Sequence, residues 1–162
     1  MWTSYHVVWT TYLEWPVQDR RSSHGWLSAM YGDLLAGDVE FSHELPNIYA
    51  SQVCPTNGVR LSADETAQFC ADSAKLCATD RVASYLKLEK CLASATYIQL
   101  LLKGDSVRLN RSIGRLKSRS ASLLLKNVDR RNSTKIWGKG FWFANLKTDA
   151  AYDAVSAFME NH

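Results

Sequence analysis

The stretch YHVVWTTY, residues 5–12, begins the pattern that decides the fold. It is dense in β-branched and aromatic residues, a composition typical of a β-strand. Residues 81–90 alternate between apolar and polar side chains, and the apolar run LASATYIQLLL follows at residues 92–102. We therefore predict two strands here, joined by a tight connection near Lys90 and Cys91. A last strand is expected within KIWGKGFWFANLK, residues 135–147, after a turn.

Helices are predicted between these strands. Ser62 followed by Glu65 is a capping-box pattern that opens the first helix. Small residues recur along this helix at helical spacing and are expected to lie close on a sheet: Ala67, Cys70, Ala71, Ala74, Cys77 and Ala78. A second helix is expected from Ser106 to about Val128, with Leu109, Ile113, Leu116, Leu123 and Leu124 facing inward. Residues 149–162 are expected to form a short C-terminal helix.

The order of these elements indicates the fold class. Strand, helix, strand, strand, helix, strand is the β-α-β-β-α-β order of the ferredoxin-like arrangement. We predict an α+β protein with an antiparallel sheet, helices on one face and an added C-terminal helix. All three prolines and four of the eight glycines fall in residues 13–61, which we interpret as a long irregular insertion within a single domain, residues 1–162.

Composition excludes several classes of protein. With 162 residues of which 46% are hydrophobic, the chain can bury a core and is too apolar for a disordered protein. No apolar run approaches the length of a membrane span, and the first residues have no basic region followed by an apolar segment. The four cysteines show neither C-x-x-C nor zinc-finger spacing, so we expect reduced thiols, no bound metal and a cytoplasmic location.

Charge is distributed unevenly along the chain. Residues 103–147 contain twelve Lys and Arg and only two Asp, a balance of +10, whereas the remaining residues have a balance of −7. This asymmetry is expected of a surface that binds a polyanion. The alternative is a solvated helix face, but the acidic partners that would form ion pairs along such a helix are nearly absent.

The candidate binding residues lie mostly on the second predicted helix. Its basic residues recur at spacings of three, four, four and seven, which places them on a common face: Arg108, Arg111, Arg115, Arg119 and Lys126, with Lys117 nearby. Trp137, beside Gly138 and Gly140, is predicted to be an exposed platform on which an unpaired base stacks. Phe141 and Phe143 alternate and are expected in the core.

Several segments, in order, resemble the HUH-type single-tyrosine transposases of insertion sequences and their REP-associated relatives. YHVVWTTY, then Trp15-Pro16, Asp19-Arg20 and SHGW at residues 23–26, resembles the start of the REP-associated group. TYIQLLLKG at 96–104 lies where the family has its His-hydrophobic-His strand, and LNRSIGRLKSRSASLLL at 109–125 is similar to the helix that follows. IWGKGFWF at 136–143 and AFMENH at 157–162 resemble the final strand and the tyrosine-bearing helix.

The resemblance implies chemistry that this sequence has lost. In the family, two histidines bind a divalent metal that polarises a DNA phosphate, and a helical tyrosine attacks that phosphate to form a covalent intermediate. The matching positions here hold Tyr97 and Gln99 in place of the histidines, Phe158 in place of the tyrosine and His162 in place of a glutamine ligand. A phenol and an amide are poor substitutes for two imidazoles.

We therefore expect a catalytically inactive, transposase-like protein that binds DNA hairpins, single-stranded DNA or RNA. The resemblance also implies a homodimer, because the family builds its active sites across two subunits. Two alternatives stay open. The chain could be an active nicking enzyme that uses Mg²⁺ or Mn²⁺ and displaced residues, with Tyr97 or Tyr152 as nucleophile. It could also be an assembly or protein-interaction subunit of a nucleoprotein complex.

Overall fold

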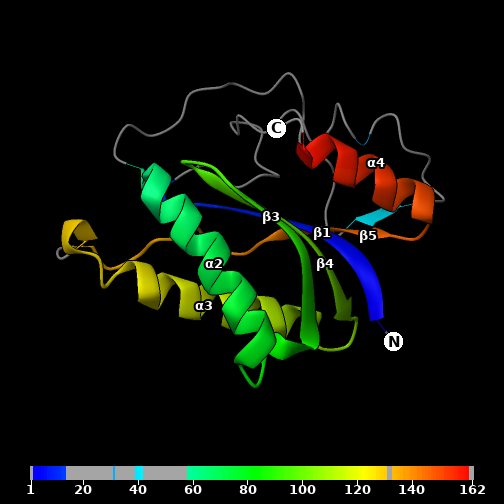
Figure 1. Cartoon of the computed structure of the whole chain (residues 1–162), viewed down its shortest axis with the longest axis horizontal. Coiled ribbons are helices and arrows are strands. Elements are labelled where there is room, and N and C mark those ends of the chain that lie inside the picture. The colour runs from blue at the N-terminus through cyan, green and yellow to red at the C-terminus, as the bar shows by residue number, and fades with distance from the viewer. Residues whose placement is uncertain (1, 14–30, 32–38, 42–57, 131–132, 161–162) are drawn as a thin grey trace.

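The computed structural model describes residues 2–13, 31, 39–41, 58–130 and 133–160 (Figure 1). Within these ranges, the strands and helices are β1 (Trp2–Thr10), β2 (Val39–Phe41), α2 (Ala63–Thr79), β3 (Leu86–Ala93), β4 (Tyr97–Asp105), α3 (Leu109–Leu124), β5 (Trp142–Leu146) and α4 (Asp149–Glu160). Short 3₁₀ turns at Ala83–Tyr85 and Val128–Arg130 precede β3 and follow α3.

The strands form an antiparallel sheet in the order β2-β5-β1-β4-β3. Without β2, this is the strand order of the ferredoxin-like fold, and α2 and α3 are its two connecting helices. The predicted fold class is therefore confirmed. β2 is a short edge strand that pairs with β5 from within the segment predicted to be irregular. Most of residues 13–61 lies outside the described part of the chain.

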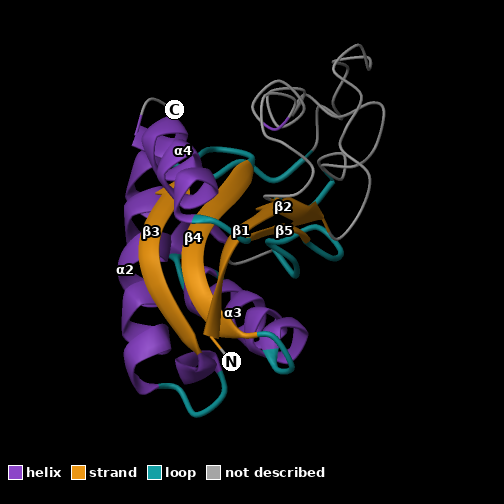
Figure 2. Ribbon diagram, turned by 90° about the vertical axis from the view of Figure 1, so that its right-hand side faces the viewer, coloured by secondary structure: helices purple, strands orange, loops and turns teal. Residues whose placement is uncertain are grey.

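Alternation along the strands places a hydrophobic cluster on each face of the sheet. On β1, Tyr5, Val7 and Trp9 pack with residues of α2 and α3. Val8 lies on the opposite face, with Val155 and Met159 of α4. Figure 2 shows the sheet between α2 and α3 on one side and α4 on the other. The two connecting helices share one face, as predicted, and the C-terminal helix covers the other.

The turn between β3 and β4 is displaced from its predicted position. Lys90 and Cys91 lie inside β3, where they pair with Leu101 and Leu100, and the chain reverses after Ala93. The prediction was wrong because an irregularity in the register between Leu88 and Lys90 interrupts the alternation that marks a strand. In the sequence, that interruption looks like the end of the strand.

Helix α2 begins as predicted, but a different stripe of it is buried. Ser62 and Glu65 form the capping box. The stripe that faces the core contains Phe69, Ser73 and Leu76, with Cys70 and Cys77 half-buried beside it. The alanines of the predicted stripe, Ala67, Ala71, Ala74 and Ala78, are exposed. Burying Phe69 and Leu76 removes more apolar area from water than burying alanines, which sets the rotation of the helix.

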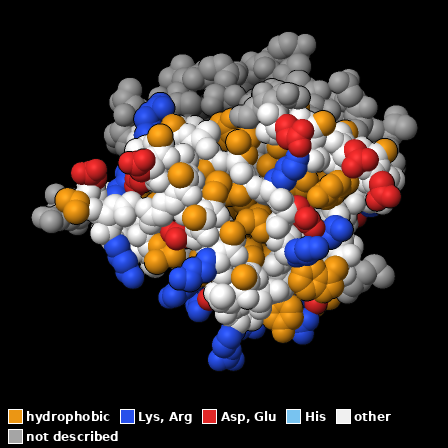
Figure 3. Space-filling model, viewed as in Figure 1, with side chains coloured by type: hydrophobic (Ala, Val, Ile, Leu, Met, Phe, Trp, Pro, Cys, Tyr) orange, Lys and Arg blue, Asp and Glu red, His pale blue; other side chains and the backbone are white. Residues whose placement is uncertain are grey.

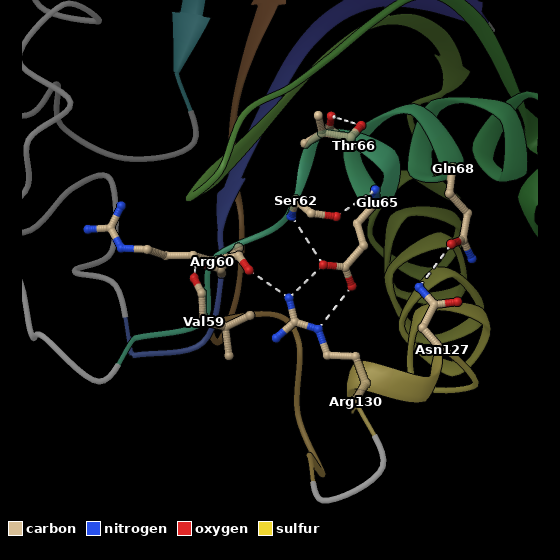
Figure 4. Close-up of polar contacts among 10 residues, drawn as sticks. Val59, Arg60, Ser62, Glu65, Thr66, Gln68, Asn127 and Arg130 are labelled. Atoms are coloured by element: carbon tan, nitrogen blue, oxygen red, sulfur yellow. Dashed lines mark hydrogen bonds and ion pairs between the residues drawn. The ribbon is translucent and has the colours of Figure 1, made fainter.

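A polar cluster joins the start of α2 to the segment after α3 (Figure 4). The Arg130 guanidinium donates two hydrogen bonds of 2.9 Å to the Glu65 carboxylate and a third, of 2.6 Å, to the carbonyl of Arg60. The Asn127 amide donates to Gln68 Oε1 at 3.0 Å. These bonds hold the start of α2 and the segment after α3 together.

Candidate functional site

The N-terminal half of α3 and the 3₁₀ turn before β3 enclose a surface cleft of about 550 Å³. Its lining includes four arginines and one aromatic ring, from two segments of the chain, residues 81–85 and 108–115: Arg81, Val82, Tyr85, Arg108, Arg111, Ser112 and Arg115. We call this site the arginine cleft. It forms because only three residues separate the end of β4 from the start of α3, which places the first two turns of α3 beside the turn that leads into β3.

Two of the four guanidinium groups in the arginine cleft are neutralised by carboxylates. Arg115 Nε lies 3.2 Å from Asp80 Oδ2, and Arg108 Nη1 lies 2.7 Å from Asp105 Oδ2. The Arg108 guanidinium also lies 4.5 Å from the centre of the Tyr85 ring, a cation–π contact. The guanidinium groups of Arg81 and Arg111 form no ion pair or hydrogen bond with any residue that the structure describes. As far as the described residues go, the cleft therefore keeps two positive charges without a carboxylate partner.

Polar groups of the first turns of α3 complete the cleft. The helix begins at Leu109 without a side-chain cap, so its first N–H groups keep the partial positive charge of a helix N-terminus. Ser112 is fully buried and lines the cleft. Its Oγ has no hydrogen-bond partner within the described part of the chain. The site thus offers guanidinium, backbone and hydroxyl donors to an anion.

The predicted basic face is only partly gathered into this site. Arg108, Arg111 and Arg115 line the arginine cleft. Arg119 is exposed one turn further along α3, and Lys126 is exposed beyond the end of the helix. At a rise of about 1.5 Å per residue, Lys126 lies about 20 Å from Arg111 along the direction of the helix axis. In Figure 3, Lys and Arg side chains lie along the lower edge over α3, whereas Asp and Glu gather over α4.

Lys117 has a structural position apart from the cleft. Its Nζ donates hydrogen bonds to the carbonyl oxygens of Gly138 and Gly140, at 2.9 and 2.6 Å, and lies 5.7 Å from the centre of the Trp9 ring. Burial lowers the pKa of Lys117 to about 8. The ammonium group therefore ties α3 to the segment before β5 and is not among the residues that line the arginine cleft.

The prediction that Trp137 is an exposed platform is wrong. Trp137 is 9% exposed, and its ring packs edge-to-face on Trp9 and Phe69 in the core. Its Nε1 donates to the carbonyl of Lys117 at 3.0 Å. The neighbouring Gly138 permits this packing rather than exposure, because a Cβ there would lie 2.8 Å from Thr10 Oγ1. Phe143, by contrast, packs against the core as expected.

The aromatic residue of the candidate site is Tyr85, which the sequence analysis did not single out. Its side chain is 37% exposed beside Arg108. The sequence did hold one signal: in the alternation of residues 81–90, Arg81 and Tyr85 fall on the polar side, opposite Val82, Leu86 and Leu88. Nothing in that alternation indicated that α3 would lie beside this face.

A buried polar trio occupies the opposite face of the sheet, at the position that the resemblance assigned to metal ligands. His6 and Gln99 are both fully buried on neighbouring strands. His6 Nε2 donates to Gln99 Oε1 at 3.0 Å, so His6 Nδ1 accepts from the Tyr31 hydroxyl at 2.8 Å. Burial lowers the pKa of His6 to about 4, which keeps the imidazole neutral at neutral pH.

These residues do not fit a divalent metal. The Gln99 carbonyl oxygen is already engaged by His6, and the neighbouring candidate ligand, Tyr97, is a phenol at the start of β4. Phe158 lies half-buried on α4 and has no oxygen. His162 lies outside the described residues. Among the described residues, no three His, Cys, Asp or Glu are grouped as metal ligands would be.

Comparison with known proteins does not assign the chain to a family. No family model matches it, and no curated protein matches it. One similar solved structure is that of a candidate transposase from Deinococcus radiodurans R1, with 14% identity over 99% of this chain and 91% of the other, and a TM-score of 0.37. A similarity of this size carries no argument about function. In the described part of the chain, no helix is long and apolar enough to cross a membrane.

Proposed function

We propose that this protein binds single-stranded or hairpin nucleic acid through the arginine cleft and does not cleave it. The observation that carries the proposal is the convergence of four arginines on one cleft, two of them without a carboxylate partner among the described residues. Guanidinium groups neutralise backbone phosphates and release condensed counterions, which favours binding of any strand regardless of its sequence.

Tyr85 adds a contact to an unpaired base. Phosphate contacts alone would not favour strands with unpaired bases over duplexes. Its ring is partly exposed at the cleft, with the Arg108 guanidinium 4.5 Å from the ring centre. Stacking of a base on an aromatic side chain contributes about 1–3 kcal/mol and tolerates any base. A base within a duplex already stacks on its neighbours, so we expect the cleft to prefer single strands, loops or ends.

The absence of cleavage is part of the proposal and is supported by the opposite face of the sheet. Gln99 is committed to His6, and Phe158 cannot form a bond to phosphorus. The transposase resemblance, the homodimer and the choice between DNA and RNA belong to the proposal as predictions. Light scattering measures the oligomeric state, and matched DNA and RNA strands of one sequence measure the preference.

The proposal is tested by fluorescence anisotropy with a labelled single strand at increasing salt. We expect Arg111→Glu with Arg115→Glu to weaken binding strongly and to reduce the salt slope by about 0.7, the share of one contact to a single strand, because Asp80 already neutralises Arg115 in the wild type. Lys126→Glu is the matched control, because it removes a basic residue about 20 Å from the cleft. Unchanged affinity in the double variant would remove the arginine cleft as the binding site.

Two further assays separate the alternatives. Incubation with labelled hairpin DNA and Mg²⁺ or Mn²⁺ is expected to give neither nicks nor a covalent adduct, and either product would favour an enzyme. Purified protein is also expected to bind nucleic acid at low salt. A protein that binds none under those conditions would favour the assembly or protein-interaction role.

A further inference from the structure

The charge of the arginine cleft matches one kind of phosphate better than another. Arg81 and Arg111 supply two positive charges that no described carboxylate neutralises. A phosphate within a strand carries a single negative charge, whereas a phosphate monoester carries about −1.5 to −2 at neutral pH. A dianion would therefore compensate the cleft, and an internal phosphate would leave it with excess positive charge.

The hydrogen-bond donors of the cleft also suit a terminal phosphate. The buried Ser112 Oγ lacks a partner among the described residues, although a buried hydroxyl without a hydrogen bond costs about 1–3 kcal/mol. The uncapped first turn of α3 begins beside it, and backbone N–H groups at a helix N-terminus bind phosphate. A monoester has three terminal oxygens, enough to accept from Ser112, the helix and the guanidinium groups together.

The size of the cleft and the position of Tyr85 fit one nucleotide. A volume of about 550 Å³ lies within the range of sites that enclose a small ligand. Tyr85 and Ser112 line the same cleft, so a phosphate held at Ser112 can leave its base against the Tyr85 ring. We propose that the arginine cleft recognises the terminal, phosphorylated nucleotide of a strand. This inference rests on the proposed function and specifies its ligand.

The experiment compares strands of one sequence that differ only at their ends. Strands with a 5′-phosphate, a 3′-phosphate or hydroxyl groups at both ends are titrated against the full chain, together with the free mononucleotide. We expect one phosphorylated end to bind about tenfold more tightly than the hydroxyl-ended strand, because it adds charge-assisted hydrogen bonds. If the phosphorylated strand also binds more tightly than the free mononucleotide, the ligand of the cleft is the end of a strand and not a free nucleotide.

Variants of the cleft distinguish recognition from folding. Ser112→Ala is expected to remove most of the preference for the phosphorylated end without lowering the free energy of unfolding, because the hydroxyl it deletes is unsatisfied without ligand. Tyr85→Leu is expected to weaken binding of both the phosphorylated and hydroxyl-ended strands, with Tyr85→Phe as a control that keeps the ring. Arg111→Gln is expected to reduce the phosphate preference, whereas Lys126→Gln leaves it unchanged.

The outcomes that contradict the inference differ from those that contradict the proposed function. Equal, salt-dependent binding of all strands would overturn terminal recognition and leave nucleic-acid binding in place. Binding of the mononucleotide without affinity for any strand would assign the cleft to free nucleotides and overturn both. A phosphate preference that Ser112→Ala does not change would overturn the role given to Ser112 and the cleft geometry built on it.

Discussion

The carboxylate of Asp80 accepts a hydrogen bond from Arg115 Nε, with 3.2 Å between Nε and Oδ2, and so joins the end of α2 to the wall of the arginine cleft. Asp80 Oδ1 also accepts from the backbone N–H groups of Ala83 and Val82, at 3.1 and 2.9 Å. The Ala83 hydrogen bond, followed by that of Val82, lowers the pKa of Asp80. Asp80 therefore stays ionised at neutral pH and cancels one arginine charge of the cleft.

Replacing this carboxylate with its neutral isostere is expected to strengthen nucleic-acid binding. In Asp80→Asn, the amide oxygen can still accept the backbone hydrogen bonds, while the existing charge of Arg115 is no longer neutralised by a carboxylate. We expect tighter binding of a labelled single strand at low salt and a salt slope larger by about 0.7. Weaker binding would show instead that Asp80 acts by positioning the Arg115 guanidinium.

Lys117 is expected to control stability and not binding. Its folded pKa of about 8 lies below the ordinary value of 10.5, so between these pH values the unfolded chain binds more protons than the folded one. The contribution of Lys117 to the free energy of unfolding therefore rises as pH increases through this window. Urea denaturation across this range should detect the rise in the wild type and find it reduced in Lys117→Met.

The same variant, Lys117→Met, tests whether Lys117 contributes to stability alone or also to nucleic-acid binding, as the arginines of the cleft do. Loss of the hydrogen bonds to Gly138 and Gly140 is expected to lower the free energy of unfolding at neutral pH, but by less than the value of about 1.5–3 kcal/mol for a charged hydrogen bond, because Met also removes the cost of burying the ammonium group. Affinity for a single strand should stay close to that of the wild type. A loss of affinity comparable to that of the Arg111 and Arg115 variant would place Lys117 in the binding surface.

The sequence predicted the order of elements well because burial imposes a period on each of them. On β4, Ile98 and Leu100 face α2 and α3 while Leu101 faces α4, and that alternation is legible without coordinates. The turn after Ala93 was misplaced because the register irregularity near Leu88 broke the same alternation. Local pattern therefore identified the strands but not their ends.

The candidate site was harder to predict from the sequence because it combines segments that are distant in the chain. Arg111 and Arg115 follow from helical spacing alone, but their proximity to Arg81 and Tyr85 depends on how α3 lies beside the turn before β3. The prediction for Trp137 was wrong for a local reason, the interpretation of its neighbouring glycines. Adjacent glycines suggested exposure, whereas one of them permits close packing against Thr10.

The Glu65–Arg130 pair is expected to make stability sensitive to acid. The hydrogen bond from Arg130 is the largest cause of the lowered pKa of Glu65, and both side chains are largely buried, at 12% and 14% exposure. A carboxylate with a lowered pKa stabilises the fold above its unfolded pKa of about 4.5, and this stabilisation is lost as pH falls through the folded pKa. Urea denaturation from neutral to acidic pH measures the loss.

Arg130→Ala provides the matched comparison. We expect it to lower the free energy of unfolding by about 1.5–3 kcal/mol at neutral pH and to flatten the decline toward acid, because Glu65 then titrates nearer its ordinary pKa. The arginine cleft lies at the other end of α3, so binding should be unaffected. An unchanged acid profile in Arg130→Ala would assign the pH dependence to other carboxylates.

The thiols of Cys70 and Cys91 are expected to form a disulfide between α2 and β3 under oxidising conditions. Their Sγ atoms lie 2.6 Å apart, and both are free thiols in the structure. The hydrogen bond between the two thiols lowers the pKa of Cys70 and raises that of Cys91, so Cys70 is the thiolate that attacks. With oxidised glutathione, Cys70 forms a mixed disulfide and releases one glutathione thiolate. Cys91 then displaces the second as it loses its proton, which leaves two reduced glutathione molecules.

Intact mass and peptide mapping measure this reaction. We expect a Cys70–Cys91 bridge in the wild type and in Cys77→Ser, because burial raises the pKa of Cys77 to about 11 and makes it a poor nucleophile at neutral pH. Cys91→Ser should stop at the mixed disulfide on Cys70. By closing a loop of about 20 residues, the bridge is expected to add about 3 kcal/mol to the free energy of unfolding. A bridge that maps to Cys54 or Cys77, or none at all, would contradict the packing of α2 on the edge strand.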